Sequence, residues 1–99
     1  MSFDFAVLEE RAKQLIDAGR QKDAIRIYLF MADGDSSLDG GYLGEVIAQC
    51  YEALGDLSAA KYWYGRAVEE NPQLRLASVA ALKRLETLTI DDLVQPKRD

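Results

Sequence analysis

The stretch from residue 47 to residue 72, IAQCYEALGDLSAAKYWYGRAVEENP, predicts two helices joined by a tight turn. Its first half places apolar side chains at helical spacing and then reaches Gly55, a residue that readily adopts the left-handed conformation found at helix ends. Asp56 follows at a position where a side-chain oxygen caps a new helix. Asn71-Pro72 closes the stretch, because proline disfavours helical geometry in the residue before it.

The two helices of this stretch carry small residues at positions that suit close packing. Their apolar faces are formed by Ile47, Tyr51 and Leu54 in the first helix and by Leu57, Ala60, Tyr64, Ala67 and Val68 in the second. Ala48, Ala60 and Ala67 would let the two helix axes approach closely. We therefore expect an antiparallel helical hairpin with Ala60 and Tyr64 in its core.

The same order of residues occurs thirty-six positions upstream. The pairs are Leu15 with Tyr51, Gly19 with Gly55, Ala24 with Ala60, Tyr28 with Tyr64, and Met31 with Ala67. Repetition at a fixed period of this size is typical of stacked helical pairs. The sequence therefore predicts two consecutive hairpins.

The skeleton of the second copy resembles the tetratricopeptide repeat (TPR) family, whose helical pairs recur about every 34 residues. That skeleton is Tyr51, Gly55, Ala60, Tyr64, Ala67 and Pro72. The resemblance covers roughly residues 5–88 and is weaker in the first copy, where Ser36 stands in place of the proline. Gly44, Ala48 and Arg11 also depart from the family, which often has tryptophan, glycine and leucine there. An unrelated antiparallel helical bundle is the alternative.

The predicted fold class is all-α, with about five helices in antiparallel helix-turn-helix repeats that form a TPR-like superhelix. One domain is expected over residues 1–90, with repeat one at 5–36, repeat two at 41–72, a capping helix at 73–89, and a charged tail at 91–99. The length of 99 residues suits one modest core. Stacked repeats leave an unburied end, which a last helix with one polar side can close.

Local signals outside the second hairpin define the remaining helices. Asp4 is the expected cap of the first helix, with Phe3 and Leu8 at the spacing of a hydrophobic staple. The apolar stripe of that helix is Phe5, Leu8, Ala12, Leu15 and Ile16. Residues 21–32 are apolar on most sides, which is typical of a helix buried between neighbours. The last helix has apolar residues at Leu74, Ala77, Ala81, Leu82, Leu85 and Leu88.

The loop DGDSSLDGG at residues 33–41 contains acids that suggest a calcium site, but the spacing does not fit. Counted from Asp33, the central glycine position of a calcium loop falls on Leu38 and the bidentate glutamate position falls on Gly44. We interpret the loop as a polar connection in which Asp39 caps the next helix, and we expect no metal.

The composition limits the classes of partner. The net charge of −5 disfavours nucleic acid, which needs a concentrated basic surface. No apolar run is long enough to cross a membrane, and the acidic start MSFDFAVLEERAKQ is unlike a signal peptide. A cytoplasmic location is the resulting expectation.

The residue types needed for common catalytic sites are missing. The chain has no histidine, and its single cysteine, Cys50, lies within an expected helix and is predicted to pack in the core. Adjacent acids such as Glu9-Glu10 do not converge on one helix face. We expect a protein that is not an enzyme and that uses no cofactor.

The TPR resemblance implies a binding scaffold, in which the first helix of each pair lines a concave surface that holds a peptide. Carried over by position, the binding residues here are Glu9, Lys13, Tyr42, Glu45, Gln49, Glu52, Lys83 and Glu86, with Ala6, Ile16, Leu76 and Val79 beside them. Only Lys13 could serve a carboxylate clamp of the kind that holds acidic tails. The hypothesis is instead a partner that carries lysine or arginine and an apolar anchor near Tyr42. Charge reversal at Glu45 and Glu52 is then expected to weaken capture without lowering the melting temperature.

Two alternatives remain open. The chain could be a self-association module that forms a homodimer through its last helix, because two and a half hairpins make a short stack. For the aromatic run at residues 61–64, packing of Trp63 under the last helix is the favoured interpretation, and an exposed contact patch of Tyr62 or Trp63 is the other.

Overall fold

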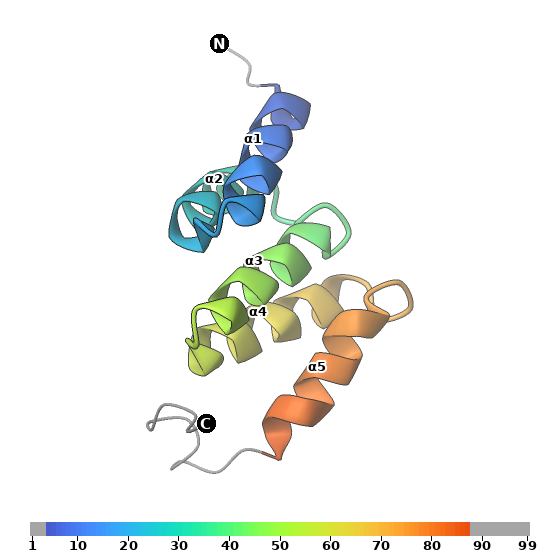
Figure 1. Cartoon of the computed structure of the whole chain (residues 1–99). Helices are drawn as coiled ribbons and strands as arrows, with labels where there is room; N and C mark the ends of the chain where they lie inside the picture. The colour runs from blue at the N-terminus through green and yellow to red at the C-terminus, as the bar shows by residue number, and fades with distance from the viewer. Residues whose placement is uncertain (1–3, 88–99) are drawn as a thin grey trace.

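Five helices and no β-strand make up residues 4–87, the part of the chain that the computed structural model describes (Figure 1). They are α1 (Phe5–Asp17), α2 (Gln21–Asp33), α3 (Tyr42–Ala53), α4 (Leu57–Glu70) and α5 (Leu76–Glu86). Each helix packs chiefly on its neighbours in sequence, so α1, α3 and α5 line one side and α2 and α4 the other. The predicted all-α, repeat-like fold is confirmed. None of these helices has the length and apolar run needed to cross a membrane.

The two hairpin turns have the same hydrogen bonds, which confirms the predicted repeat at this point. Gly19 and Gly55 both adopt left-handed backbone conformations, with φ of 77° and 82°. The Gly19 and Arg20 N–H groups donate to the carbonyl oxygens of Ile16 and Leu15, and the Gly55 and Asp56 N–H groups donate to those of Glu52 and Tyr51. This pair of hydrogen bonds is the Schellman motif, which satisfies carbonyl groups at a helix end.

Two of the three expected helix caps are present. Asp4 Oδ1 accepts from the N–H of Ala6 at 3.0 Å, and Asp56 Oδ1 accepts from the N–H of Ala59 at 3.1 Å. The prediction that Asp39 caps the next helix is wrong, because α3 begins after Gly41, which has a φ of 86°. The backbone N–H of Asp39 donates instead to Asp35 within the loop.

The close contact between α3 and α4 forms the centre of the fold. Ala48, Ala60 and Ala67 are fully buried, and Tyr64 is 3% exposed, which confirms the predicted helical register. The α3 backbone also lies against α4 at two glycines. A Cβ atom added to Gly44 would lie 3.2 Å from the Trp63 carbonyl oxygen, and one added to Gly41 would lie 2.5 Å from that of Ala67.

The last helix begins later than predicted. Residues 71–75 form a turn in which Asn71 Oδ1 accepts from the N–H of Leu74 at 3.2 Å, and α5 starts at Leu76. Leu74 and Ala77 are therefore exposed, although we expected both on the apolar face. The buried residues of α5 are Ser78, Ala81 and Leu85. Phe3, Leu88 and the tail at 91–99 lie outside the described residues.

Replacing two of the left-handed glycines, Gly41 and Gly55, one at a time tests the α3–α4 contact. We expect Gly55→Ala to lower the free energy of unfolding by about 1–2 kcal/mol, because space around it is open and only the backbone conformation is unfavourable. Gly41→Ala should cost about 3 kcal/mol or more, because its Cβ also collides with α4. Urea denaturation followed by circular dichroism measures both, and equal costs would contradict the contact.

Candidate functional site

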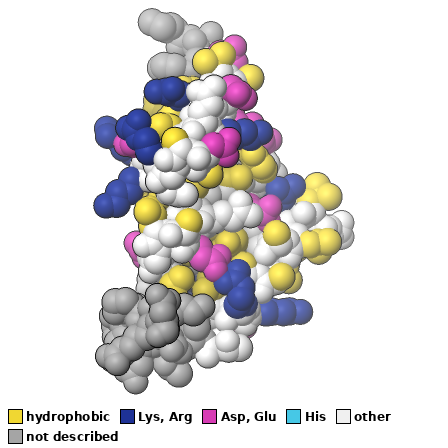
Figure 2. Space-filling view, in the orientation of Figure 1, with side chains coloured by type: hydrophobic (Ala, Val, Ile, Leu, Met, Phe, Trp, Pro, Cys, Tyr) yellow, Lys and Arg dark blue, Asp and Glu magenta, His cyan; other side chains and the backbone are white. Residues whose placement is uncertain are grey.

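The residues predicted from the sequence as a binding face come from α1, α3 and α5, which lie on the same side of the molecule (Figure 1). Lys13, Gln49, Lys83 and Glu86 are exposed, whereas Glu9, Tyr42, Glu45 and Glu52 are partly buried. Figure 2 shows acidic and basic side chains interspersed on the face in view, with no continuous acidic strip. The partly buried residues therefore determine what this inner face, meaning the side lined by α1, α3 and α5, can bind.

The carboxylate of Glu45 is already engaged within the fold. Its Oε2 accepts from both the backbone N–H of Ser78, at 3.1 Å, and the Ser78 hydroxyl, at 2.7 Å. Arg75 lies 3.6 Å from the other oxygen. Arg75 stands at the N-cap position of α5, but its side chain makes no capping hydrogen bond. Glu45 of α3 caps this helix instead.

Glu52 connects three helices in a similar way. Its Oε1 accepts from the Tyr64 hydroxyl of α4 at 2.8 Å, and the Arg84 guanidinium of α5 donates to both of its oxygens. The hydrogen bond from Arg84, followed by that from Tyr64, holds the pKa of Glu52 below its ordinary value. Burial and the bond to Glu52 raise the pKa of Tyr64.

These contacts change the expectation for two predicted binding residues. Charge reversal at Glu45 or Glu52 would remove acceptors on which α5 depends and would place like charges together. We therefore expect it to lower the melting temperature, which is the opposite of the expectation from the sequence. Neither carboxylate is free to receive a partner.

Glu9 of α1 and Tyr42 of α3 lie together in a cleft of about 250 Å³. Its other lining residues are Phe5, Ala6, Met31, Asp35, Asp39 and Leu43. Burial, and then a hydrogen bond donated to Glu9, raise the pKa of the Tyr42 hydroxyl. Burial and the nearby charge of Glu9 raise the pKa of Tyr28 to about 12. Both hydroxyls therefore remain protonated at neutral pH.

The second oxygen of Glu9, Oε2, is buried and has no hydrogen-bond partner among residues 4–87. Asp35, at the rim of the cleft, is occupied by its own loop, since it accepts from the backbone and hydroxyl of Ser37 and from the N–H of Asp39. On the far side of Tyr42, the Arg75 guanidinium carbon lies 6.0 Å from the ring centre. Glu9 therefore lines a partly apolar cleft beside an aromatic side chain, and one of its oxygens is buried without a donor.

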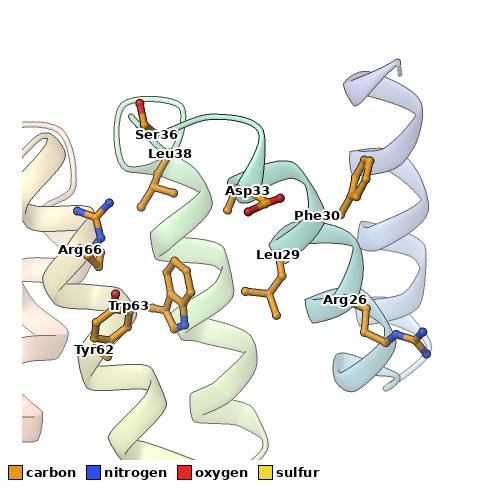
Figure 3. Close-up of a pocket in the computed structure, with 10 residues that line it drawn as sticks. Arg26, Leu29, Phe30, Asp33, Ser36, Leu38, Tyr62, Trp63 and Arg66 are labelled. Carbon is orange, nitrogen blue, oxygen red and sulfur yellow. The ribbon is translucent and has the colours of Figure 1, made fainter. Parts of the chain in front are cut away.

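A second and larger hollow, of about 730 Å³, lies between α2 and α4. Trp63 points across it toward Leu29 of α2, with Leu38 at one end (Figure 3). Trp63 also packs against the core cluster that contains Ala81 and Leu85 of α5, so the prediction that it packs under the last helix holds in part. Tyr62, which is 60% exposed, meets Trp63 edge to face with ring centres 5.3 Å apart. Of the two aromatic residues, only Tyr62 is exposed, and the alternative of a contact patch there stays a prediction.

No family model, curated protein or solved structure matches this chain. The likeness to tetratricopeptide repeats therefore remains a resemblance that rests on the residues quoted above. Within residues 4–87, no three His, Cys, Asp or Glu side chains are grouped so that they could hold a metal ion.

The sequence placed Glu9 and Tyr42 among the predicted binding residues. It did not predict the contacts that engage Glu45 and Glu52 within the fold. Ser78 and Glu45 are 33 positions apart, so no local pattern links them. The one available signal was the absence of a capping side chain at Arg75, which implied that the α5 N-terminus had to find an acceptor elsewhere. The hollow was indicated only by the dense aromatic run at residues 61–64.

Removal of the cap on α5 should destabilise the whole domain. We expect Glu45→Ala to lower the free energy of unfolding by about 2–3 kcal/mol, because the buried Ser78 loses a charged acceptor for both of its donors. Glu86→Ala, which removes an exposed acid, is the matched control and should change it by less than about 0.5 kcal/mol. Equal effects in urea denaturation would show that Glu45 does not hold α5.

Stability should also depend on pH through Glu52. A pKa that is lower in the folded protein means that the ionised form stabilises the fold. This contribution is complete above the ordinary value of 4.5 and is lost as the pH falls through the lower folded pKa. We expect Glu52→Gln to flatten the fall in unfolding free energy below pH 4.5, whereas Glu86→Gln should leave it unchanged. Thermal melts across this pH range make the comparison, and parallel curves would exclude the role of Glu52.

Proposed function

We propose that this chain is a non-catalytic protein-interaction module whose inner face binds a segment of another protein. The repeat-like helical arrangement supports the proposal, because stacked hairpins present extended surfaces that bind polypeptides. The resemblance to tetratricopeptide repeats points the same way. A cytoplasmic location belongs to the proposal and rests on composition.

The single observation that carries the proposal is the unpartnered Oε2 of Glu9 in the cleft beside Tyr42. A buried carboxylate oxygen without a donor is costly, and a turn of the Glu9 side chain into the cleft would let an incoming N–H donor remove that cost. Lysine and arginine supply charged donors on long side chains. The remaining walls, Phe5, Met31 and Leu43, are apolar and suit a neighbouring apolar side chain.

The proposal of a partner segment with lysine or arginine plus an apolar anchor therefore becomes more specific. The sequence offered four carboxylates as contacts for the basic side chain of the partner. We propose Glu9 alone, because Glu45 and Glu52 are already paired and Glu86 is exposed to solvent. The net charge of −5 would also attract a basic segment over longer distances.

A non-catalytic role is consistent with the state of the only thiol. Cys50 is 3% exposed, and burial raises its pKa, which favours the unreactive protonated form. We propose on these grounds that the chain acts by binding alone.

Self-association through the last helix is the second candidate function. Leu76, the first residue of α5, is 66% exposed, and Leu74 just before it is 67% exposed. Two neighbouring leucines in water would gain from burial against a second copy. Substitution of Leu76 by aspartate should abolish a dimer formed through the last helix and leave peptide binding at the Glu9 cleft unchanged.

Selection from a library of short random peptides displayed on phage tests the proposed function. We expect the enriched peptides to share lysine or arginine beside a large apolar residue, and to shift the amide NMR signals of Glu9, Met31 and Tyr42. Glu9→Gln should weaken the best peptide about ten-fold or more, because the amide cannot pair with a cation.

The matched control is Glu86→Gln, which removes the same charge from the inner face outside the cleft. It should leave affinity within about two-fold. Enrichment of acidic peptides, or binding that Glu9→Gln does not weaken while the variant melts normally, would refute the proposal.

A further inference from the structure

The loop between α2 and α3 contains a turn of four consecutive left-handed residues. They are Leu38, Asp39, Gly40 and Gly41, with φ between 53° and 86°. The left-handed region is unfavourable for residues that carry a Cβ atom, so Leu38 and Asp39 hold a strained backbone. The N–H of Gly41 closes the turn by donating to the Ser37 carbonyl oxygen at 3.1 Å. Backbone strain in this loop therefore coincides with an Asp-Gly pair at residues 39 and 40.

An Asp-Gly pair is the dipeptide in which aspartate rearranges most readily, because glycine has no side chain to shield its backbone nitrogen. The glycine nitrogen bonds to Cγ of the aspartate, and the hydroxyl of the carboxyl group leaves as water with the proton of the N–H group. Water then opens the resulting succinimide ring. Opening at Cγ restores aspartate. Opening at the main-chain carbonyl carbon gives isoaspartate, in which the main chain runs through Cβ.

The sequence contains two Asp-Gly pairs, at residues 33–34 and 39–40, and the fold presents their nitrogens differently. Asp33 is the last residue of α2, and the N–H of Gly34 donates to the Met31 carbonyl oxygen at 3.2 Å. The N–H of Gly40 has no acceptor among residues 4–87. The nitrogen of the first pair must therefore break a hydrogen bond before it can react, whereas that of the second pair need not.

The space around the two pairs also differs. A Cβ atom added to Gly34 would lie 3.6 Å from both the Met31 carbonyl oxygen and the Phe5 ring, so this glycine is enclosed on two sides. Around Gly40 the nearest atom is Nδ2 of Asn71, at 4.0 Å. Residues 39 and 40 are both exposed, so water can reach the ring that would form there.

Ring closure requires rotation about the Cα–C bond of the aspartate. At Asp33 this rotation would leave a favourable helical conformation and release the N–H of Gly34. At Asp39 it takes a residue out of the left-handed region and gives up one backbone bond, from the Tyr42 N–H to the Asp39 carbonyl oxygen. We propose that Asp39 converts spontaneously to isoaspartate in the folded protein, and that the end of α2 protects Asp33.

The product would change one wall of the cleft that contains Glu9. Asp39 lines this cleft, and isoaspartate keeps the negative charge but lengthens the main chain of the turn by a methylene group. The turn has little room for the extra length, because Leu38 is 4% exposed and Gly41 lies against α4. Aged molecules would therefore carry an altered cleft. The conversion itself does not depend on what the cleft binds, so it and the proposed function can fail independently.

Incubation of the full chain for several weeks at neutral pH and physiological temperature tests the proposal. Electron-transfer fragmentation in a mass spectrometer distinguishes isoaspartate from aspartate at each position. In the folded chain we expect at least about five-fold more isoaspartate at Asp39 than at Asp33, because only Gly34 must first give up a hydrogen bond. In urea, which removes the structure, the two pairs should react at rates within about two-fold of each other.

Replacing each aspartate by asparagine gives a matched and faster second measurement. Asparagine forms the same ring but loses ammonia instead of water, so the reaction changes the mass of the chain. It also tolerates the left-handed conformation, so Asp39→Asn should keep the turn, and thermal melts check that both variants are folded. In the folded chain Asp39→Asn should lose ammonia at least about five-fold faster than Asp33→Asn, and in urea at a similar rate.

Three results would each overturn the proposal. The first is isoaspartate at Asp33 that equals or exceeds that at Asp39 in the folded chain. The second is a folded chain without isoaspartate at Asp39 after a time that produces it in urea. The third is an equal rate of ammonia loss from the two folded asparagine variants.

Discussion

The backbone contact between α3 and α4 is the constraint on which the other packing depends. Gly41 and Gly44, which have no side chain, bring α3 against the carbonyl oxygens of Ala67 and Trp63. At this separation the Glu52 carboxylate reaches the Tyr64 hydroxyl. A bulkier residue at either glycine would push α4 outward, and α5, which packs on α4, would move away from the Glu45 side chain that caps it.

The inner-face carboxylates show how the fold assigns different roles to one residue type. Glu45 and Glu52 lie where α5 presents N–H, hydroxyl and guanidinium donors, so they become structural. Glu9 lies near the hydroxyls of Tyr42 and Tyr28, and its second oxygen is left without a donor among residues 4–87. The number of nearby donors, and not the charge itself, therefore distinguishes the carboxylates that hold the fold from the one with an oxygen left without a donor.

Features that depend on neighbours in sequence were predictable, and features that depend on distant residues were not. The turns at Gly19 and Gly55 and the caps at Asp4 and Asp56 are set within a few residues of each site, and all four are present. The start of α5 was misplaced because the Asn71 side chain closes a turn after the proline. The pairing of Glu45 with Ser78 and the direction of Trp63 follow from how the helices stack, which the periodicity of one helix does not contain.

Comparison of the two repeats explains why Arg66 and Glu69 of α4 form an ion pair whereas Arg26 and Asp33 of α2 do not. At the repeat offset, Arg26, Phe30 and Asp33 correspond to Tyr62, Arg66 and Glu69. In α4 the charged pair is three residues apart, and Arg66 donates to Glu69 at 3.1 Å within its own helix. In α2 the pair is seven residues apart, a separation that side chains of one helix do not bridge. The outer side of the helix therefore carries charges that pair within the helix in one repeat and that stay in contact with solvent in the other.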